Sequence, residues 1–193
     1  LRSRTKRCVK ESTTFTGHTR DGFRIHRRRD FPADEALEVI RRHDRALRGE
    51  NGEAVVCKNE DRTAVTLCRS DALPRLERHR PTPPDDMLQG RVCVKSFHAR
   101  TLGERLKDCL RWRGRAMQAW VALRGFSVRG LPAARPIAVL ERRKKLDSDR
   151  DYLVMEALED TRDLEQFVRT GPSPEERRKL ARAVAGLLHQ LFR

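Results

Sequence analysis

Aromatic residues are scarce in this chain of 193 residues, which has seven Phe, two Trp and one Tyr. Proteins that bind single-stranded nucleic acid stack bases on aromatic side chains set among basic residues. The scarcity therefore weighs against that class of protein. Long apolar runs are missing as well, so we expect no membrane-spanning helix, and no apolar stretch of an export signal follows the basic start of the chain.

Cysteine pairs are also missing. The five cysteines are odd in number and form no CxxC motif, so we expect neither a disulfide framework nor a zinc knuckle. Reduced thiols in the cytoplasm fit this pattern best. Cys57, Cys68 and Cys93 fall on three predicted neighbouring strands, but no His lies at ligand spacing, which favours buried thiols over a metal site.

Positive charge is what the sequence has in excess. Its 43 Lys and Arg against 28 Asp and Glu leave a formal net charge of +15, and 35 of the basic residues are Arg. Arg favours bidentate contacts with phosphates and carboxylates. Nucleic acid, a phosphorylated lipid or sugar, and a nucleotide are the expected partners, and a solvated Arg-rich surface is the alternative.

Hydrophobic periodicity predicts a folded domain that mixes strands and helices. Strands are possible in the basic first thirty residues, and a helix is expected over 32–48, where acidic residues follow Pro32. The expected elements that follow are a hairpin (54–58 and 64–68), a strand (91–97), a helical region (102–124) broken at Gly114, two strands (136–142 and 152–155) and two helices (163–169 and 173–193).

The last predicted helix begins with a capping box. Ser173 is the N-cap, Pro174 follows it, and Glu176 lies three residues after the cap. We expect the apolar face of this helix to be buried and His189, which we place inside that face, to be structural. The apolar face consists of Leu180, Val184, Leu187, Leu188 and Leu191.

Four stretches of the chain resemble one known family. They are VCVK at 92–95, GRAMQAW at 114–120, GLPAARPIAVLE at 130–141 and YLVMEAL at 152–158. These are similar to the bacterial lipopolysaccharide kinase (Kdo/WaaP) family, over roughly residues 54–193. The resemblance implies an α+β, protein-kinase-like N-lobe, with an antiparallel sheet of about five strands and a C-type helix, followed by the first helices of a C-lobe.

The resemblance also divides the chain and places a nucleotide site. It implies a basic N-terminal extension with a helix (1–53), the N-lobe and hinge (54–158) and the start of a C-lobe (159–193). Lys95 would meet the α- and β-phosphates of ATP, and a surface Lys at a strand end is the alternative. Met155 would be the gatekeeper.

The remaining site residues implied by the resemblance surround Lys95. The backbone of Glu156 and Leu158 would contact the adenine, unless this stretch is an ordinary edge strand. Gln118 stands where kinases place the carboxylate partner of the Lys, and Glu104 is the other candidate partner. The first hairpin offers Lys58, Arg62 and Thr63 to the phosphates, but its turn lacks the glycines of protein kinases, so a solvated turn is the alternative.

The implied function is that of an ATP-dependent phosphotransferase acting with Mg²⁺ on a sugar hydroxyl of the lipopolysaccharide core. The acceptor would be a phosphorylated glycolipid or sugar, and the protein would lie in the cytoplasm against the anionic inner-membrane surface. We expect the catalytic loop to follow Arg193, so that the catalytic residues are unknown and this chain alone transfers little phosphate. The alternatives are a pseudokinase or nucleotide-binding regulatory module, and a basic nucleic-acid-binding domain.

Overall fold

The computed structural model describes residues 11–50, 54–72, 90–98, 101, 103, 114–142, 150–158 and 164–192. Glu104 and the rest of the predicted helical stretch before Gly114 lie outside this set, residue 103 excepted. The described elements are β1 (Phe15–Arg20), β2 (Phe23–Arg28), α2 (Ala33–Leu47), β3 (Ala54–Glu60), β4 (Thr63–Arg69), β5 (Arg91–His98), α4 (Arg115–Val128), β6 (Pro136–Arg142), β7 (Arg150–Glu156), α5 (Leu164–Arg169) and α6 (Pro174–Phe192).

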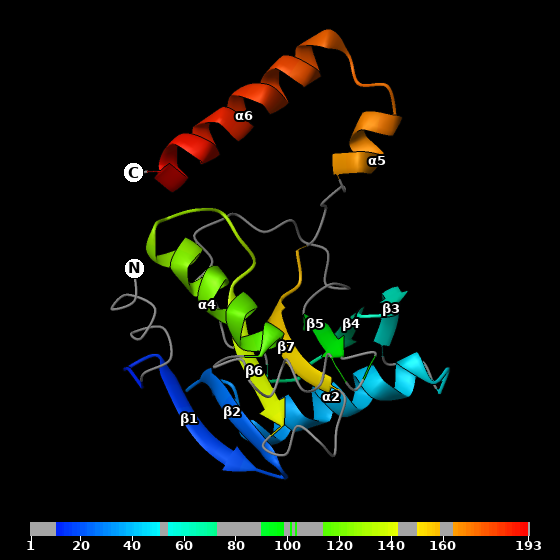
Figure 1. Ribbon diagram of the computed structural model, residues 1–193, viewed down its shortest axis with the longest axis vertical. Coiled ribbons are helices and arrows are strands. Elements are labelled where there is room, and N and C mark those ends of the chain that lie inside the picture. The colour runs from blue at the N-terminus through cyan, green and yellow to red at the C-terminus, as the bar shows by residue number, and fades with distance from the viewer. Residues whose placement is uncertain are drawn as a thin grey trace.

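The strands form one antiparallel sheet in the order β1-β2-β6-β7-β5-β4-β3 (Figure 1). The expectation of about five strands was wrong, because β1 and β2 extend the sheet beyond β6 to seven strands. In β2 the buried Phe23 and Ile25 alternate with Arg24 and His26. Two large apolar residues in a basic stretch are too weak a pattern to establish a strand from sequence.

The other predicted elements are confirmed within the described residues. The helix expected over 32–48 is α2, and the first hairpin is β3 and β4, joined by the two-residue turn Asp61–Arg62. Gly114 is the N-cap residue of α4. The capping box of α6 is present, since the amide of Glu176 donates to Ser173 Oγ at 3.3 Å and the amide of Ser173 donates to Glu176 Oε2 at 2.8 Å.

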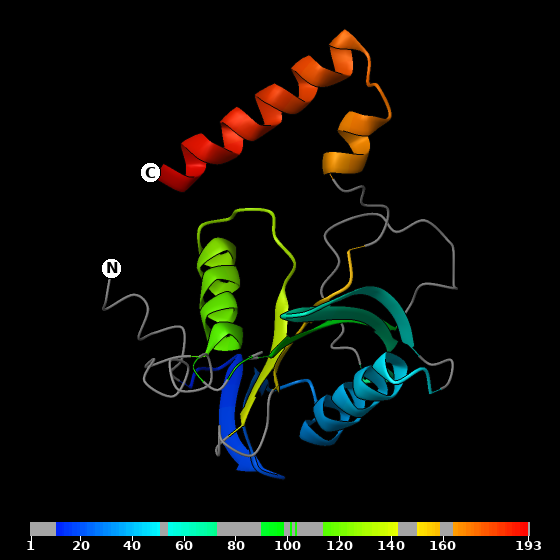
Figure 2. The same ribbon diagram turned by 45° about the vertical axis from the view of Figure 1, so that its right-hand side comes forward.

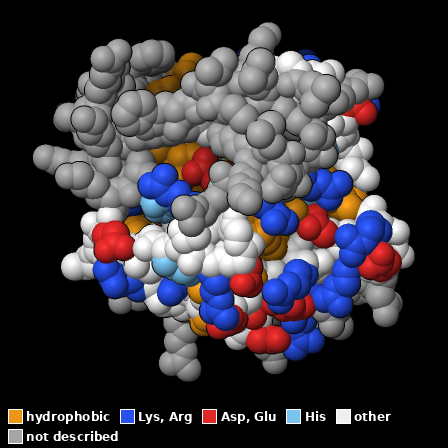
Figure 3. All heavy atoms as spheres, turned by 60° about the horizontal axis from the view of Figure 1, so that its bottom comes forward, with side chains coloured by type: hydrophobic (Ala, Val, Ile, Leu, Met, Phe, Trp, Pro, Cys, Tyr) orange, Lys and Arg blue, Asp and Glu red, His pale blue; other side chains and the backbone are white. Residues whose placement is uncertain are grey.

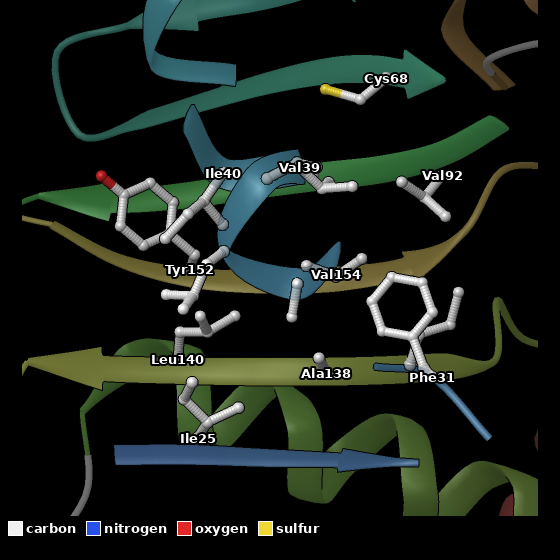
Figure 4. Packing of buried hydrophobic residues seen from close by; sticks show 14 of the residues in the cluster. Ile25, Phe31, Val39, Ile40, Cys68, Val92, Ala138, Leu140, Tyr152 and Val154 are labelled. Carbon is white, nitrogen blue, oxygen red and sulfur yellow. The ribbon is translucent and has the colours of Figure 1, made fainter. Parts of the chain in front are cut away.

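A helix covers each face of the sheet, α2 on one side and α4 on the other (Figure 2). Figure 4 shows the core under α2, where Val39 and Ile40 meet Leu140 and Val154 of the central strands. On the opposite face, which we call the α4 face, a smaller cluster forms. Its buried members are Ala116, Met117, Trp120, Val139 and Leu153.

Asp44 ties the end of α2 to the sheet. Its carboxylate accepts hydrogen bonds from Tyr152 Oη at 2.8 Å and from Arg150 Nη1 at 3.0 Å, both on β7. Because the acceptor is charged, such bonds are stronger than those between neutral groups. The polar contacts therefore fix where α2 lies on the sheet, and the apolar contacts supply most of its burial.

The apolar face of α6 is exposed, contrary to the expectation that it would be buried. Val184 is 41% exposed and Leu188 50% exposed, and His189 is exposed as well. With its six residues, α5 is too short to cover the face of the 19-residue α6. The two helices instead line an open apolar groove of about 630 Å³, with Phe167 and Leu180 among its walls.

None of the helices that the structure describes is both long enough and apolar enough to cross a membrane.

Candidate functional site

Lys95 lies in the middle of the sheet, on the α4 face. It is opposite Val65 of β4 and Leu153 of β7, and Val65 is opposite Lys58 of β3. Leu153 in turn is opposite Val139 of β6, and both pack under α4. Paired residues of neighbouring strands share a face, so this row of residues places Lys95 and Lys58 on the same side of the sheet.

The ammonium group of Lys95 lies beside an aromatic ring. Its Nζ is 5.2 Å from the ring centroid of Phe97, two residues further along β5, and Phe97 packs against the cluster under α4. Within the residues that the structure describes, Lys95 forms no ion pair. The half-buried cation is thus held by apolar neighbours and available to an anion.

Apolar side chains continue the α4 face beside Lys95. Cys93 lies opposite Leu67 of β4 and Met155 of β7, and Met155 also packs against the cluster under α4. Burial raises the pKa of the Cys93 thiol to about 11, so it remains protonated at neutral pH and acts as a small apolar group. A cation next to an apolar strip suits a ligand with one anionic and one apolar part.

The first hairpin contributes its polar residues at the turn. Lys58 Nζ lies 2.8 Å from Glu60 Oε1, and both side chains are exposed. Thr63 is opposite Phe97 and therefore shares the α4 face with Lys95. Arg62 is in the exposed turn, where its carbonyl accepts a hydrogen bond from the amide of His98 at 3.1 Å, so β5 holds the turn.

The end of β7 carries the residues expected to contact a base. Glu156 is the last residue of the strand, opposite Val92, and its amide donates to the carbonyl of Arg135 at 2.9 Å. Leu158 lies two residues further and is 55% exposed. The chain thus leaves the sheet next to Met155, at the edge of the apolar strip.

Gln118 is in the first turn of α4 but is exposed, whereas Ala116 and Met117 are buried. The structure therefore brings Lys95, Met155, Thr63 and Lys58 onto one face and leaves the side chain of Gln118 on the outer side of the helix. Glu104 lies outside the described residues. The functional roles assigned to all these residues remain predictions.

Sequence reasoning missed the neighbours that give Lys95 its environment. Phe97 and Cys93 alternate with the buried Val94 and Ser96 along β5, so the strand pattern itself placed them on the side of Lys95. That signal was available in the sequence. The partners on β4 and β7 were not, because register across strands depends on tertiary packing.

The comparison with protein families identifies the chain. The model of the lipopolysaccharide kinase (Kdo/WaaP) family matches residues 85–193, which is more than half of the chain. The chain belongs to this family. No curated protein and no solved structure matches this member of the lipopolysaccharide kinase family.

The matched range of this kinase-family chain includes β5, α4, β6, β7, α5 and α6, and with them Lys95, Met155, Glu156 and Leu158. The elements β1 to β4 and α2 precede the match. The kinase family as such indicates use of a nucleotide and of a sugar acceptor.

Proposed function

We propose that the chain binds ATP on the α4 face of β3, β4, β5 and β7, and that it serves transfer of the γ-phosphoryl group to a sugar hydroxyl of the lipopolysaccharide core. Membership of a lipopolysaccharide kinase family supports the reaction class. The observation that carries the nucleotide site is the position of Lys95, half-buried in the middle of the sheet beside Cys93 and Met155.

The proposed lobe structure is supported by the order of the elements. The strands β3 to β7 form an antiparallel sheet of five strands, with α4 between β5 and β6 in the chain. This is the arrangement that a protein-kinase-like N-lobe requires. The helices α5 and α6 then begin the C-lobe, and β1, β2 and α2 are additions to the N-lobe.

Each part of the face has a proposed role in binding the nucleotide. The ammonium group of Lys95 donates to the phosphates, since a charge-assisted contact in a half-buried position is strong. Leu67, Cys93 and Met155 offer the apolar surface for the base, and the carbonyl of Glu156 and the backbone of Leu158 form hydrogen bonds with its edge. The β3–β4 hairpin offers further contacts to the phosphates through Lys58, Arg62 and Thr63.

The described residues do not by themselves offer a metal site. They contain no group of three or more His, Cys, Asp or Glu side chains placed to hold an ion. In this proposal Mg²⁺ enters with the phosphates of ATP, and the described side chains have no proposed role in holding it.

The net charge of +15 also has a proposed role. Part of it attracts the protein to the anionic membrane surface that carries the acceptor.

A nucleotide-binding regulatory module is the second candidate function. It is favoured by the residue at the position of the kinase ion-pair partner, where this chain has the uncharged and exposed Gln118. Kinases position their catalytic Lys by such a pair. A module of this kind binds ATP on the same face and transfers no phosphate.

The nucleotide site is tested by thermal unfolding of the protein with and without ATP. We expect the wild type to gain roughly 5–10 °C in Tm at ATP about 100-fold above its Kd, and Lys95→Met to gain little. Lys179→Met on the exposed part of α6 is the matched control and should respond like the wild type. Equal shifts in Lys95→Met and the wild type would remove Lys95 from the site.

Transfer of labelled γ-phosphate from ATP to lipopolysaccharide core sugars, measured with the intact protein, separates the two candidate functions. A kinase shows transfer that Lys95→Met abolishes. Binding of ATP without transfer to any core sugar would favour the regulatory module.

A further inference from the structure

The N-terminal strand β1 contacts α4 through one aromatic ring. The ring of Phe15 meets the buried Trp120 edge to face, with centroids 5.2 Å apart and an interplanar angle of 86°. The guanidinium carbon of Arg124, one turn further along α4, lies 3.9 Å from the centroid of the Phe15 ring. Phe15 thus contacts Trp120 and Arg124, which lie on the same side of α4.

The same helix contacts the proposed nucleotide face. The cluster that contains Trp120 and Met117 also contains Leu153, which is opposite Lys95, and it packs against Phe97, whose ring lies under the Lys95 ammonium group. A continuous set of packed side chains therefore leads from Phe15 through α4 to the neighbours of Lys95.

The position of α4 depends strongly on such contacts. Its N-cap is Gly114, which supplies no side-chain cap hydrogen bond, and its first turn has no acidic residue. Only Ala116, Met117 and Trp120 are buried along its 14 residues. A helix with few buried residues and weak capping is positioned by the elements packed against it.

We propose that Phe15 is a positioning residue for the nucleotide site: β1, which lies outside the matched family range, braces α4 and so holds the packed surface that supports Lys95. The inference rests on the proposed function. Loss of the ring frees one flank of α4, and the packing of the cluster that contains Trp120 and Leu153 loosens with it. The binding-competent arrangement around Lys95 is then less populated, and the apparent affinity for ATP falls.

The chain contains a matched control for this contact. Phe23 on β2 lies under the guanidinium group of Arg142 at 4.1 Å and meets Tyr152 edge to face at 5.9 Å. Phe23 belongs to the core under α2, on the opposite face of the sheet from α4. It combines the same kinds of contact, yet it does not belong to the cluster that supports Lys95.

The test compares Phe15→Leu, Phe15→Tyr and Phe23→Leu with the wild type, by calorimetric titration with ATP and by hydrogen exchange of the α4 amides. We expect Phe15→Leu to weaken ATP binding about fivefold and to speed exchange over residues 115–128. Phe15→Tyr keeps the ring and should stay close to the wild type. Phe23→Leu should lose thermal stability and keep the wild-type affinity.

The possible outcomes distinguish a failure of the Phe15 brace from a failure of the proposed ATP-binding function. A wild type that does not bind ATP would remove the proposed function and the inference with it. If the wild type binds and Phe15→Leu binds equally well, or if Phe23→Leu weakens binding as much, the brace is overturned and the nucleotide site stands. Should Phe15→Leu not fold, Arg124→Gln decides: about twofold weaker binding supports the brace, and unchanged binding overturns it.

Discussion

At the scale of single residues, His43 shows how burial sets a protonation state. Its side chain is fully buried, and its Nδ1 lies 2.8 Å from Thr66 Oγ1, in a hydrogen bond between α2 and β4. Burial lowers the pKa of His43 to about 4, with a smaller lowering effect from the charge of Arg150 and an opposing effect from Asp44. At neutral pH the ring is therefore uncharged.

This pKa makes stability depend on pH in a known direction. Below pH 6.5 the unfolded chain binds a proton on His43 that the folded protein does not bind, so stability falls as the pH drops toward 4. The shift corresponds to a loss on the order of 3 kcal/mol from this residue. We expect His43→Asn to be less stable than the wild type at pH 7.5 but to lose less stability on acidification, as measured by urea unfolding from pH 7.5 to 4.

Two other histidines provide the comparison. Burial also lowers the pKa of His26 to about 4, so part of the acid sensitivity should persist in His43→Asn. His189 is exposed, and His189→Asn should keep the full pH dependence of the wild type. An unchanged slope in His43→Asn would show that the buried ring does not control acid stability.

At the scale of elements, the start of α4 lies close to two carboxylates. The amide of Gly114 donates to Glu141 Oε1 at 3.2 Å, and Asp151 Oδ1 accepts a hydrogen bond from the amide of Arg142 at 3.1 Å. A Cβ at Gly114 would lie 2.6 Å from Asp151 Oδ2 and 3.0 Å from Glu141 Oε1. The absence of a side chain at this position lets α4 approach β6 and β7.

We expect Gly114→Ala to cost about 1–3 kcal/mol in the free energy of unfolding, because a carboxylate held by its hydrogen bond must move. Gly125→Ala within the same helix meets open space and should gain about 1 kcal/mol from helix propensity. In the double variant Gly114→Ala/Asp151→Ala, about 1 kcal/mol of the loss should be non-additive. Additive losses in the denaturant unfolding of these variants would contradict the steric explanation.

The elements also show what could be predicted from sequence. The helix α2, the β3–β4 hairpin and the α6 capping box depend on local spacing, and each is present. The strand β1 could not be established from the sequence. It is held by its pairing with β2, and polar residues such as Thr16 and His18 give no hydrophobic pattern that predicts this pairing. Hydrophobic periodicity predicts that α6 has an apolar face, but it does not predict whether another element covers that face.

The site was predictable in the same uneven way. Lys95 was singled out by the resemblance of its strand to the kinase family, and the structure puts it with Met155 on one face. Its aromatic neighbour Phe97 was within reach of the strand pattern. The contact of Phe15 with Trp120 was not, because it joins residues 105 positions apart, and only the sheet order brings them together.

At the scale of the whole molecule, the basic residues lie among acidic ones on the face formed by described residues. Figure 3, from the side at the bottom of Figure 1, shows Lys and Arg interspersed with Asp and Glu. Glu38 on α2 is an example, with Arg41, Arg42 and Arg45 each within 3.5 Å. Pairing of this kind limits the field that this face presents, so net charge alone is a poor guide to its partner.

The core unites the N-terminal region with the family-matched range. The cluster under α2 combines residues of β2, of α2 and of the turn between them with residues of β4 to β7. The members that precede residue 54 are Phe23, Ile25, Phe31, Ala36, Leu37, Val39 and Ile40. Burial of these side chains contributes roughly 10 kcal/mol, which is comparable to the entire stability of a domain of this size.

We therefore expect a chain that begins at residue 54 to lose cooperative folding, because β6 becomes an open edge and the face under α2 is exposed. Near-UV circular dichroism should be lost and binding of a hydrophobic dye should increase. A chain that ends at residue 158 removes α5 and α6, which contribute nothing to either described core cluster, and should keep a cooperative transition. If residues 54–193 unfold cooperatively with the Tm of the full chain, the N-terminal region is an appendage; otherwise the kinase-family range needs these preceding residues to fold.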